Sequence, residues 1–294
     1  MSRRPPNKPP SKGKRRPPNP GGSKRSRGDR LPARSGPSGA KRRDHKRHSS
    51  QKRYDSDLVK GRHAVEALVS HQPKRVRALY HWGRSDAQQV LQAARASDIP
   101  VVSAPPDDEM ANDHLAQGLA AKVRPYRYLD LDELAPDDRV ERALLVLDGV
   151  TPHNLGAILR SAAFFAFDGV ILPRDRSASV NPAVERISRG ATAIVPIAQV
   201  TNIARTISTL RDRGYLTVVT TLSPDAVPLA DVELRAPIAL VLGGEGRGAR
   251  RLVVQKCELQ TTVPALGPMQ SLNVASFATL IMAAARGFRG RDSA

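Results

Sequence analysis

The chain has 294 residues, 40% hydrophobic and 4% aromatic, which is enough for one or two domains with apolar cores. Its formal net charge is +19, but residues 1–53 carry 19 Lys and Arg against two Asp, which leaves a net charge of only +2 for the rest. The single cysteine, Cys257, excludes internal disulfides and multi-cysteine metal sites, and we expect a buried, inert thiol there. The histidines beyond the basic segment show no metal-ligand spacing, so no metal site is predicted.

Residues 1–55 are predicted to form a disordered basic tail. Pro, Gly, Ser, Lys and Arg dominate it, and too little apolar surface is present to offset the entropy of ordering. Runs such as 14–16 and 41–43 suit salt-dependent attraction to a phosphate backbone, with a solubilising tail as the alternative. The tail lacks the apolar stretch of a signal peptide, and no later apolar run approaches the ~20 residues of a membrane span. We therefore expect a cytoplasmic protein.

Residues 56–127 have the pattern of a small α/β domain. A helical segment is followed by a predicted strand over 75–82, a helix over 85–97 and a strand over 99–104. A further helical turn and a strand at 119–123 complete the unit. Residues 128–140 are polar and are predicted to be a linker.

Residues 141–290 alternate short apolar runs with segments able to form helices. Six runs are predicted strands, at 143–150, 168–173, 193–200, 215–222, 238–244 and 259–264. Because continuous apolar strands separated by helices are typical of sheets covered on both faces, we predict a mostly parallel sheet. Ligands of such sheets bind beyond the carboxyl ends of the strands, so the residues that follow each run are the candidate site.

One of these loops, Leu240–Arg251, places four glycines around a single carboxylate, Glu245. A P-loop is excluded, because its glycine run ends in Lys and Ser or Thr, where this chain has Arg and Gly. The dinucleotide fingerprint is matched only loosely, since the loop follows the fifth strand and the next strand ends without an acid. Two interpretations stay open, a turn whose backbone approaches a ligand closely and an ordinary strand-to-helix turn with an exposed Glu.

Polar residues follow two other strands. Asn154 is predicted near a helix N-terminus, and Arg160 lies in an apolar segment where it is costly to bury unless an anion meets it. Phosphate recognition by Arg160 is therefore predicted. Ser271 and Asn273 open a long apolar helix. Capping of backbone amides is the alternative to a functional role for Asn154, Ser271 and Asn273.

Three segments together resemble the motifs of the SpoU/TrmH branch of the SPOUT RNA methyltransferases, in the same order and spacing: LDGVTPHNLGAILRSA, ALVLGGEGRGARRL and VPALGPMQSLNVASFATLI. The segment between the first two resembles the RlmB-type rRNA enzymes, while GYLTVVTT and the tail resemble YfiF-like members. The resemblance spans about Val59 to Phe288. It implies 2′-O-methylation of a ribose in RNA (rRNA ahead of tRNA), S-adenosylmethionine as methyl donor, a homodimer, and a SPOUT domain with a C-terminal trefoil knot.

The resemblance also implies roles for individual residues. The positions matching the family's cofactor contacts are Gly243, Val263 and Leu272, with Leu242, Gly244 and Ser271 beside them. The positions matching its catalytic residues are Asn154, Arg160, Glu245, Ser271 and Asn273. The family's proposed base is Arg160, but a guanidinium holds its proton in proteins, so we assign Arg160 to gripping the RNA phosphate and organising the nucleophile. Glu245, Asn154 and Asn273 would orient Arg160 and the ribose, and Ser271 would shape the junction of cofactor and substrate.

Residues 59–123 resemble the family's substrate-binding domain, which is similar to small RNA-binding ribosomal proteins. Tyr80, Trp82 and Tyr126 are its candidate stacking residues, with core packing as the alternative. The first motif departs from the family, because Thr151 meets Pro152 without the usual intervening residue, and in the third Ala265 replaces a common Met. A non-catalytic RNA-binding or ribosome-assembly factor with this fold is the alternative function. A nicotinamide dehydrogenase is less favoured, since no His or Tyr near the glycines is placed to handle a hydride.

Overall fold

A computed structural model describes residues 57–83, 86–138, 140–244, 246, 248–269 and 271–287. The predicted basic tail and Glu245 lie outside the described residues. Two β-sheets organise the described chain, and each has its own hydrophobic core. None of the described helices is long and apolar enough to cross a membrane.

The first sheet belongs to the small α/β domain that the sequence predicts. Its four strands lie in the order β1-β4-β2-β3, with β2 and β3 parallel and the other pairs antiparallel. Apolar residues of α2 and α3 pack on one face and form a core with Val59, Leu79 and Ala121. The elements are β1 (Leu58–Lys60), α2 (Arg62–His71), β2 (Val76–His81), α3 (Gln88–Ala96), β3 (Val101–Val102), α4 (Asp108–Ala111) and β4 (Leu119–Val123).

The second sheet has seven strands, all parallel, in the order β7-β6-β5-β10-β8-β11-β9. All six apolar runs singled out in the sequence form strands of this sheet. The seventh strand, β9, was not predicted, because it is a two-residue exposed edge strand that contains a proline. The strands are β5 (Ala143–Asp148), β6 (Gly169–Pro173), β7 (Ile197–Val200), β8 (Leu216–Thr220), β9 (Val227–Pro228), β10 (Ile238–Gly243) and β11 (Leu259–Thr262).

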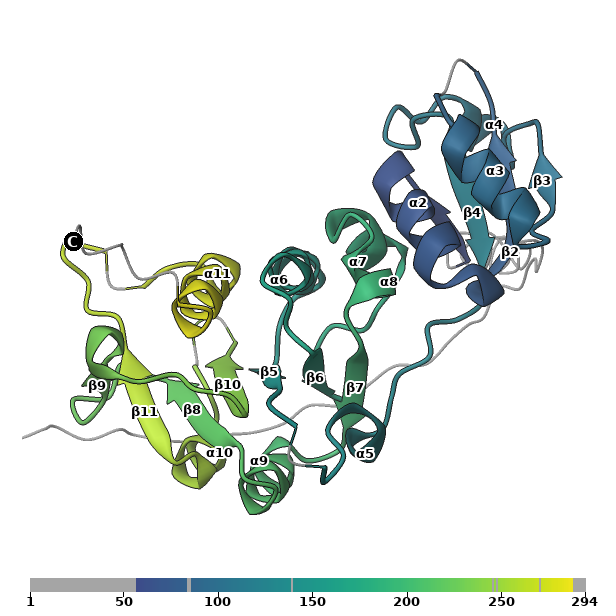
Figure 1. The fold of residues 1–294 in the computed structure, drawn as a ribbon. Coiled ribbons are helices and arrows are strands. Elements are labelled where there is room, and N and C mark those ends of the chain that lie inside the picture. Colours follow the sequence, from purple (N-terminus) through teal and green to yellow (C-terminus); the bar gives the residue numbers. More distant parts are fainter. Residues whose placement is uncertain are drawn as a thin grey trace, which may run out of the picture. The chain divides into compact units, whose positions relative to one another are not determined.

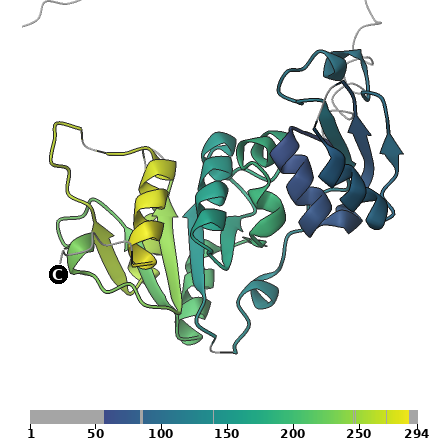
Figure 2. The same ribbon diagram turned by 45° about the horizontal axis from the view of Figure 1, so that its top comes forward.

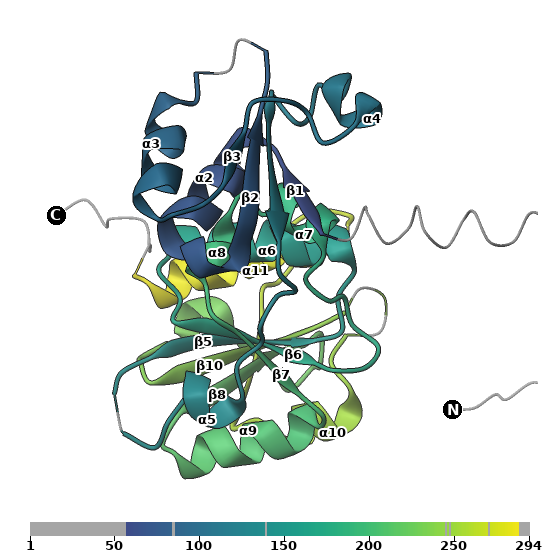
Figure 3. The same ribbon diagram turned by 90° about the vertical axis from the view of Figure 1, so that its right-hand side faces the viewer.

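Helices cover both faces of the seven-stranded sheet, as its continuous apolar strands require (Figure 1). One face packs against α6 (Pro152–Phe164), α7 (Pro182–Ile187), α8 (Ala191–Ile194) and α11 (Val274–Ala285). The other packs against α5 (Leu131–Leu134), α9 (Ile203–Asp212) and α10 (Arg251–Lys256). The two layers are separated clearly when the sheet is viewed nearly edge-on (Figure 3).

Alternation of side chains along the strands supplies both cores. On β5, Leu145 and Leu147 face the α6 layer, whereas Leu144 and Val146 face the α9 layer, and all four are fully buried. On α9, residues spaced by three and four, Ile203, Ile207 and Leu210, enter the core as predicted. Asn202 caps this helix through its side chain, which accepts from the Arg205 amide at 3.0 Å.

The segment 128–140, predicted to be a linker, contains a short helix and joins the core. Helix α5 begins with a capping box in which Asp130 and Glu133 accept from each other's backbone amides. Leu134 and Ala135 at its end are buried against the α9 face of the sheet. The run of acids that suggests solvent exposure thus serves partly as a helix cap.

A buried ion pair joins Arg75, which precedes β2, to Glu185 of α7. The Arg75 Nη2 atom lies 2.5 Å from Glu185 Oε1, and the Tyr126 ring lies 5.1 Å from the guanidinium carbon. Only 12% of the Arg75 side chain and 2% of the Glu185 side chain are exposed. Burial raises the pKa of the Glu185 carboxyl, against the lowering effect of Arg75.

We expect Arg75→Leu to lower the free energy of unfolding by about 3–5 kcal/mol at pH 8, because it leaves a buried carboxylate without its cation. The raised pKa of Glu185 means that the folded state binds its proton more tightly than the unfolded state. That contribution is present at low pH and is lost as the pH rises through the folded pKa. Because Arg75 lowers the pKa of Glu185, its removal raises that pKa further, and the variant loses more stability than the wild type as the pH rises. The variant's defect is therefore expected to shrink at pH 5. Urea unfolding of both proteins at the two pH values measures this. An equal defect at both would contradict it.

Candidate functional site

The loop after β10 closes on itself at the carboxyl edge of the sheet. Gly244 and Gly248 pair as an isolated antiparallel bridge, and the Gly248 amide donates to the Gly244 carbonyl at 3.1 Å. Gly246 and Gly248 have φ values of 80° and 64°, which glycine adopts without strain. The segment is therefore a tight turn at the end of the central strand β10, a conformation that both open interpretations share.

Gly243 and Gly244 are required by contacts of the backbone with itself. A Cβ at Gly243 would lie 1.9 Å from the Ala249 nitrogen, and one at Gly244 would lie 2.4 Å from the Gly149 carbonyl oxygen. The resemblance implied that these glycines admit the cofactor. The structure shows a second reason for glycine at these two positions: the turn packs against its own backbone at residues 248–249 and against the loop after β5.

Gly243→Ala is expected to lower the free energy of unfolding by about 1–3 kcal/mol, because backbone atoms must move to admit the methyl group. Gly267→Ala is the matched control. Gly267 has no left-handed φ, and no heavy atom lies within 4 Å of its added Cβ. Thermal unfolding that shows the same midpoint for both variants would contradict this account of the turn.

Asp148 and Arg250 anchor the turn, and sequence reasoning did not single out either residue. Asp148 ends β5, and its side chain is 0% exposed. It accepts from the Arg250 backbone amide at 2.8 Å and from Arg250 Nε at 2.8 Å, and it also contacts Nη2. The sequence does contain a signal for this pair: Asp148 ends a fully apolar strand, and a carboxylate buried there needs a hydrogen-bonding or charged partner.

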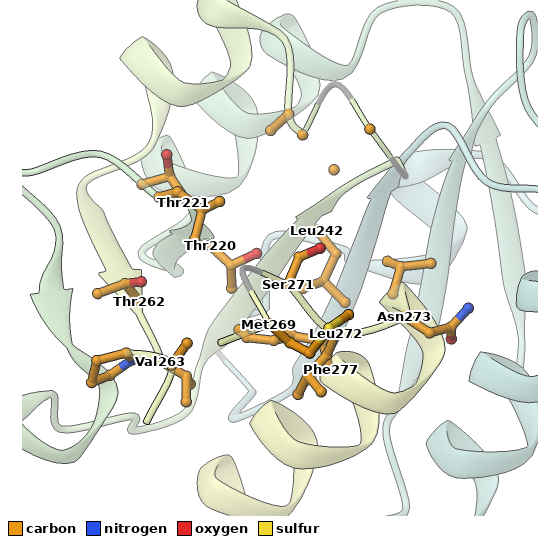
Figure 4. Close-up of a pocket in the computed structure, with 18 of the residues that line it drawn as sticks. Thr220, Thr221, Leu242, Thr262, Val263, Met269, Ser271, Leu272, Asn273 and Phe277 are labelled. Carbon is orange, nitrogen blue, oxygen red and sulfur yellow. The ribbon is translucent and has the colours of Figure 1, made fainter. Parts of the chain in front are cut away.

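A pocket of about 1000 Å³ opens between the ends of β8, β10 and β11, the turn after β10 and the segment 263–274. Figure 4 shows Thr220, Thr221 and Thr262 on one side of this pocket and Leu242, Ser271 and Leu272 on the other. All five residues predicted to contact the cofactor, Leu242, Gly243, Gly244, Val263 and Leu272, line it.

The described lining of this pocket is electrically neutral. It consists of glycine, threonine, apolar residues, Ser271 and Asn273, without a charged side chain. An adenosine joined to an amino acid through sulfur would meet apolar walls, hydroxyls and strand-end backbone here. The residues present therefore fit S-adenosylmethionine.

Two of the predicted catalytic residues contact each other at the edge of this pocket. Asn273 is the N-cap of α11, and its Oδ1 accepts from the amides of Ala275 at 2.9 Å and Ser276 at 3.4 Å. Its Nδ2 donates to Oδ1 of Asn154, which is 4% exposed in the first turn of α6. Capping thus accounts for Asn273 in part, while Thr151, not Asn154, caps α6.

Arg160 lies apart from these residues. It is exposed on α6 and lines a second pocket of about 750 Å³ with His153, Phe164, Ile187 and others, and none of the described residues of the first pocket lines the second. Six residues on a helix turn the side chain by about 240°, so Asn154 and Arg160 point in different directions. Next to Arg160, Ser161 hydrogen-bonds Thr279 of α11 at 2.7 Å (Figure 2 shows α6 beside α11).

The candidate stacking residues and the cysteine are partly buried against apolar clusters: Tyr80, Trp82, Tyr126 and Cys257. Tyr80 and Trp82 are half-buried against a small cluster that contains Leu58 and Met110. Cys257 is half-buried after α10, and burial raises the pKa of its thiol to about 12. The thiol is therefore protonated at neutral pH, as expected for an inert cysteine.

Comparison with known families gives two matches along the chain. Residues 142–283 match the SpoU rRNA Methylase family, and residues 58–129 match the family of RNA 2′-O ribose methyltransferase substrate-binding domains. The second match ends where segment 128–140 begins.

Curated relatives cover most of both chains. The 23S rRNA (guanosine-2′-O-)-methyltransferase RlmB of Pseudomonas aeruginosa is 41% identical over 227 residues, covering 74% of this chain and 91% of its own. A protein of Staphylococcus saprophyticus named as a TrmH family tRNA/rRNA methyltransferase is 36% identical, covering 76% and 93%. A solved TrmH family structure from Porphyromonas gingivalis is 28% identical with a TM-score of 0.64, covering 81% and 92%.

Proposed function

Because the chain belongs to the SpoU family of RNA 2′-O-ribose methyltransferases, we propose that it methylates a ribose 2′-hydroxyl of rRNA with S-adenosylmethionine as donor. The pocket beside the Gly243–Gly248 turn, which all five residues proposed to contact the donor line, is the observation that carries this proposal. Relatives named as 23S rRNA guanosine methyltransferases favour a guanosine of large-subunit rRNA as the target.

The chain's own residues would divide the work of positioning. Leu242, Val263 and Leu272 supply apolar walls for the donor, which when bound provides an activated methyl group on a sulfonium. The hydrogen-bonded pair Asn154 and Asn273 would hold the ribose in line with the donor, and alignment of two reactants alone supplies several kcal/mol of a reaction barrier. Arg160 would grip an RNA phosphate, for which its bidentate fork is suited.

The finer features of the family belong to the same proposal. A homodimer formed over α6 and α11 would cover Phe164, which is 79% exposed, and Leu280, and would bring Arg160 of one copy near the donor pocket of the other. The segment 259–285 would form the trefoil knot that the resemblance implies. The small N-terminal domain and the basic tail would select the RNA.

Methyl transfer to rRNA tests the function directly. Purified protein is incubated with tritiated S-adenosylmethionine and with rRNA from a strain that lacks the gene, and the methylated nucleotide is then mapped. We expect one 2′-O-methylated ribose that is absent from the deletion strain and restored by the protein. Normal donor binding without transfer to rRNA or tRNA would instead support the non-catalytic alternative.

A further inference from the structure

We propose that the turn Arg174–Arg176, which follows β6, is a binding site for an RNA backbone phosphate next to the target ribose. This inference rests on the proposed function and adds a substrate contact to it. The turn lies at the carboxyl edge of the parallel sheet, because β6 pairs with β5 and ends at Pro173. This edge also carries the Gly243–Gly248 turn.

A chain of close backbone contacts leads from Arg176 to the donor pocket. A Cβ at Gly149 would lie 3.2 Å from the Arg176 carbonyl oxygen, and a Cβ at Gly244 would lie 2.4 Å from the Gly149 carbonyl oxygen. Gly244 itself lines the donor pocket. The β6 turn, the loop after β5 and the turn after β10 are therefore stacked, and Arg176 lies two backbone contacts from the pocket.

The conformation of Arg176 is one that favours glycine. Its φ is 61°, and the turn is held there by the Ala178 amide, which donates to the Val150 carbonyl at 2.9 Å, and by Ser177 Oγ, which accepts from the Val150 amide at 3.3 Å. A left-handed φ is strained for a residue with a side chain. Glycine would adopt this φ with less strain than arginine does. The backbone conformation therefore gives no reason for an arginine at this position, and a role for its guanidinium group is indicated.

The charges of the turn have no partners within the described part of the chain. Arg174, Asp175 and Arg176 are all exposed, and neither arginine side chain forms an ion pair or hydrogen bond with a described residue. By contrast, Arg250 on the neighbouring turn is held by Asp148. Two free guanidinium groups against one carboxylate leave the turn with a net positive charge.

A phosphodiester is the ligand that this arrangement fits. The described lining of the pocket carries no charged side chain, and the two arginines lie outside it, on a turn past which the backbone of an RNA would run while a ribose enters. Guanidinium groups bind phosphate oxygens bidentately, and such contacts fix the register of a nucleic acid without selecting its sequence. Arg176 would accordingly position the ribose relative to the donor.

Arg176→Gly tests the proposal, because it removes the guanidinium and suits the backbone. Steady-state methylation of rRNA from a deletion strain gives KM and kcat, and filter binding of in vitro transcribed 23S rRNA gives the salt dependence. We expect KM for RNA to rise about tenfold and the slope of log Kd against log salt to fall by about 0.7 to 1. Affinity for S-adenosylmethionine and the thermal midpoint should not decrease.

Arg189→Gly is the matched control, since Arg189 is also an exposed arginine with a positive φ, of 50°, in the turn between α7 and α8. We expect its KM for RNA to stay near that of the wild type. The proposal is overturned if Arg176→Gly and Arg189→Gly have the same KM, if Arg176→Gly loses donor affinity, or if its thermal midpoint falls. If the wild type transfers no methyl group, the proposed function has failed, and filter binding still reports whether Arg176 contacts RNA.

Discussion

Arg160→Ala is expected to lower kcat for RNA methylation by about 10²- to 10³-fold, the usual cost of removing one preorganised electrostatic contact from an active site. Arg160 is exposed and lines a different pocket from the residues that fit the donor. Its removal therefore leaves the donor pocket intact, and affinity for S-adenosylmethionine should change less than twofold. Single-turnover methylation and titration calorimetry measure the two quantities separately.

Two further variants make this result specific. Arg160→Lys keeps the charge but loses the planar fork, so we expect an intermediate rate. Arg205→Ala removes an exposed arginine from α9, on the opposite face of the sheet, and should behave as the wild type. If Arg160→Ala loses donor binding together with turnover, Arg160 does not have the separate role assigned to it.

The sequence predicts the strands of the larger sheet well for a definite reason. Strands buried on both faces are continuously apolar, and β5 and β10 are among the most buried segments of the described chain. Periodicity likewise predicts α9, where three apolar residues share a face. Strand β9 carries neither signal, because it is two residues long and exposed.

The site is predicted less completely, because distance along the chain does not reveal contact. The motifs place Asn154 and Asn273 in one site, but their direct hydrogen bond depends on how α6 and α11 pack. The six-residue spacing of Asn154 and Arg160 on one helix does predict that their side chains point in different directions. Composition cannot show that Gly243 and Gly244 admit neighbouring backbone, since that requires the path of the loop after β5.

The pairing of Asp148 with Arg250 leads to an asymmetric prediction. Arg250→Ala is expected to lower the free energy of unfolding by about 3–5 kcal/mol, because it leaves a fully buried carboxylate with only the backbone amide of residue 250. Asp148→Asn should cost less, about 1–3 kcal/mol, since the Arg250 side chain is 53% exposed and water can solvate it. Urea unfolding at pH 7 measures both values.

The double variant Asp148→Asn/Arg250→Ala separates a charge effect from simple loss of packing. Once Asn replaces the carboxylate, removal of the Arg250 side chain leaves no unpaired buried charge. The double variant should therefore be more stable than Arg250→Ala alone. Donor affinity should follow the same order, because Arg250 adjoins the turn that lines the donor pocket. If the two single costs simply add, the pair contributes through packing, and the buried charge of Asp148 does not govern the conformation of the Gly243–Gly248 turn.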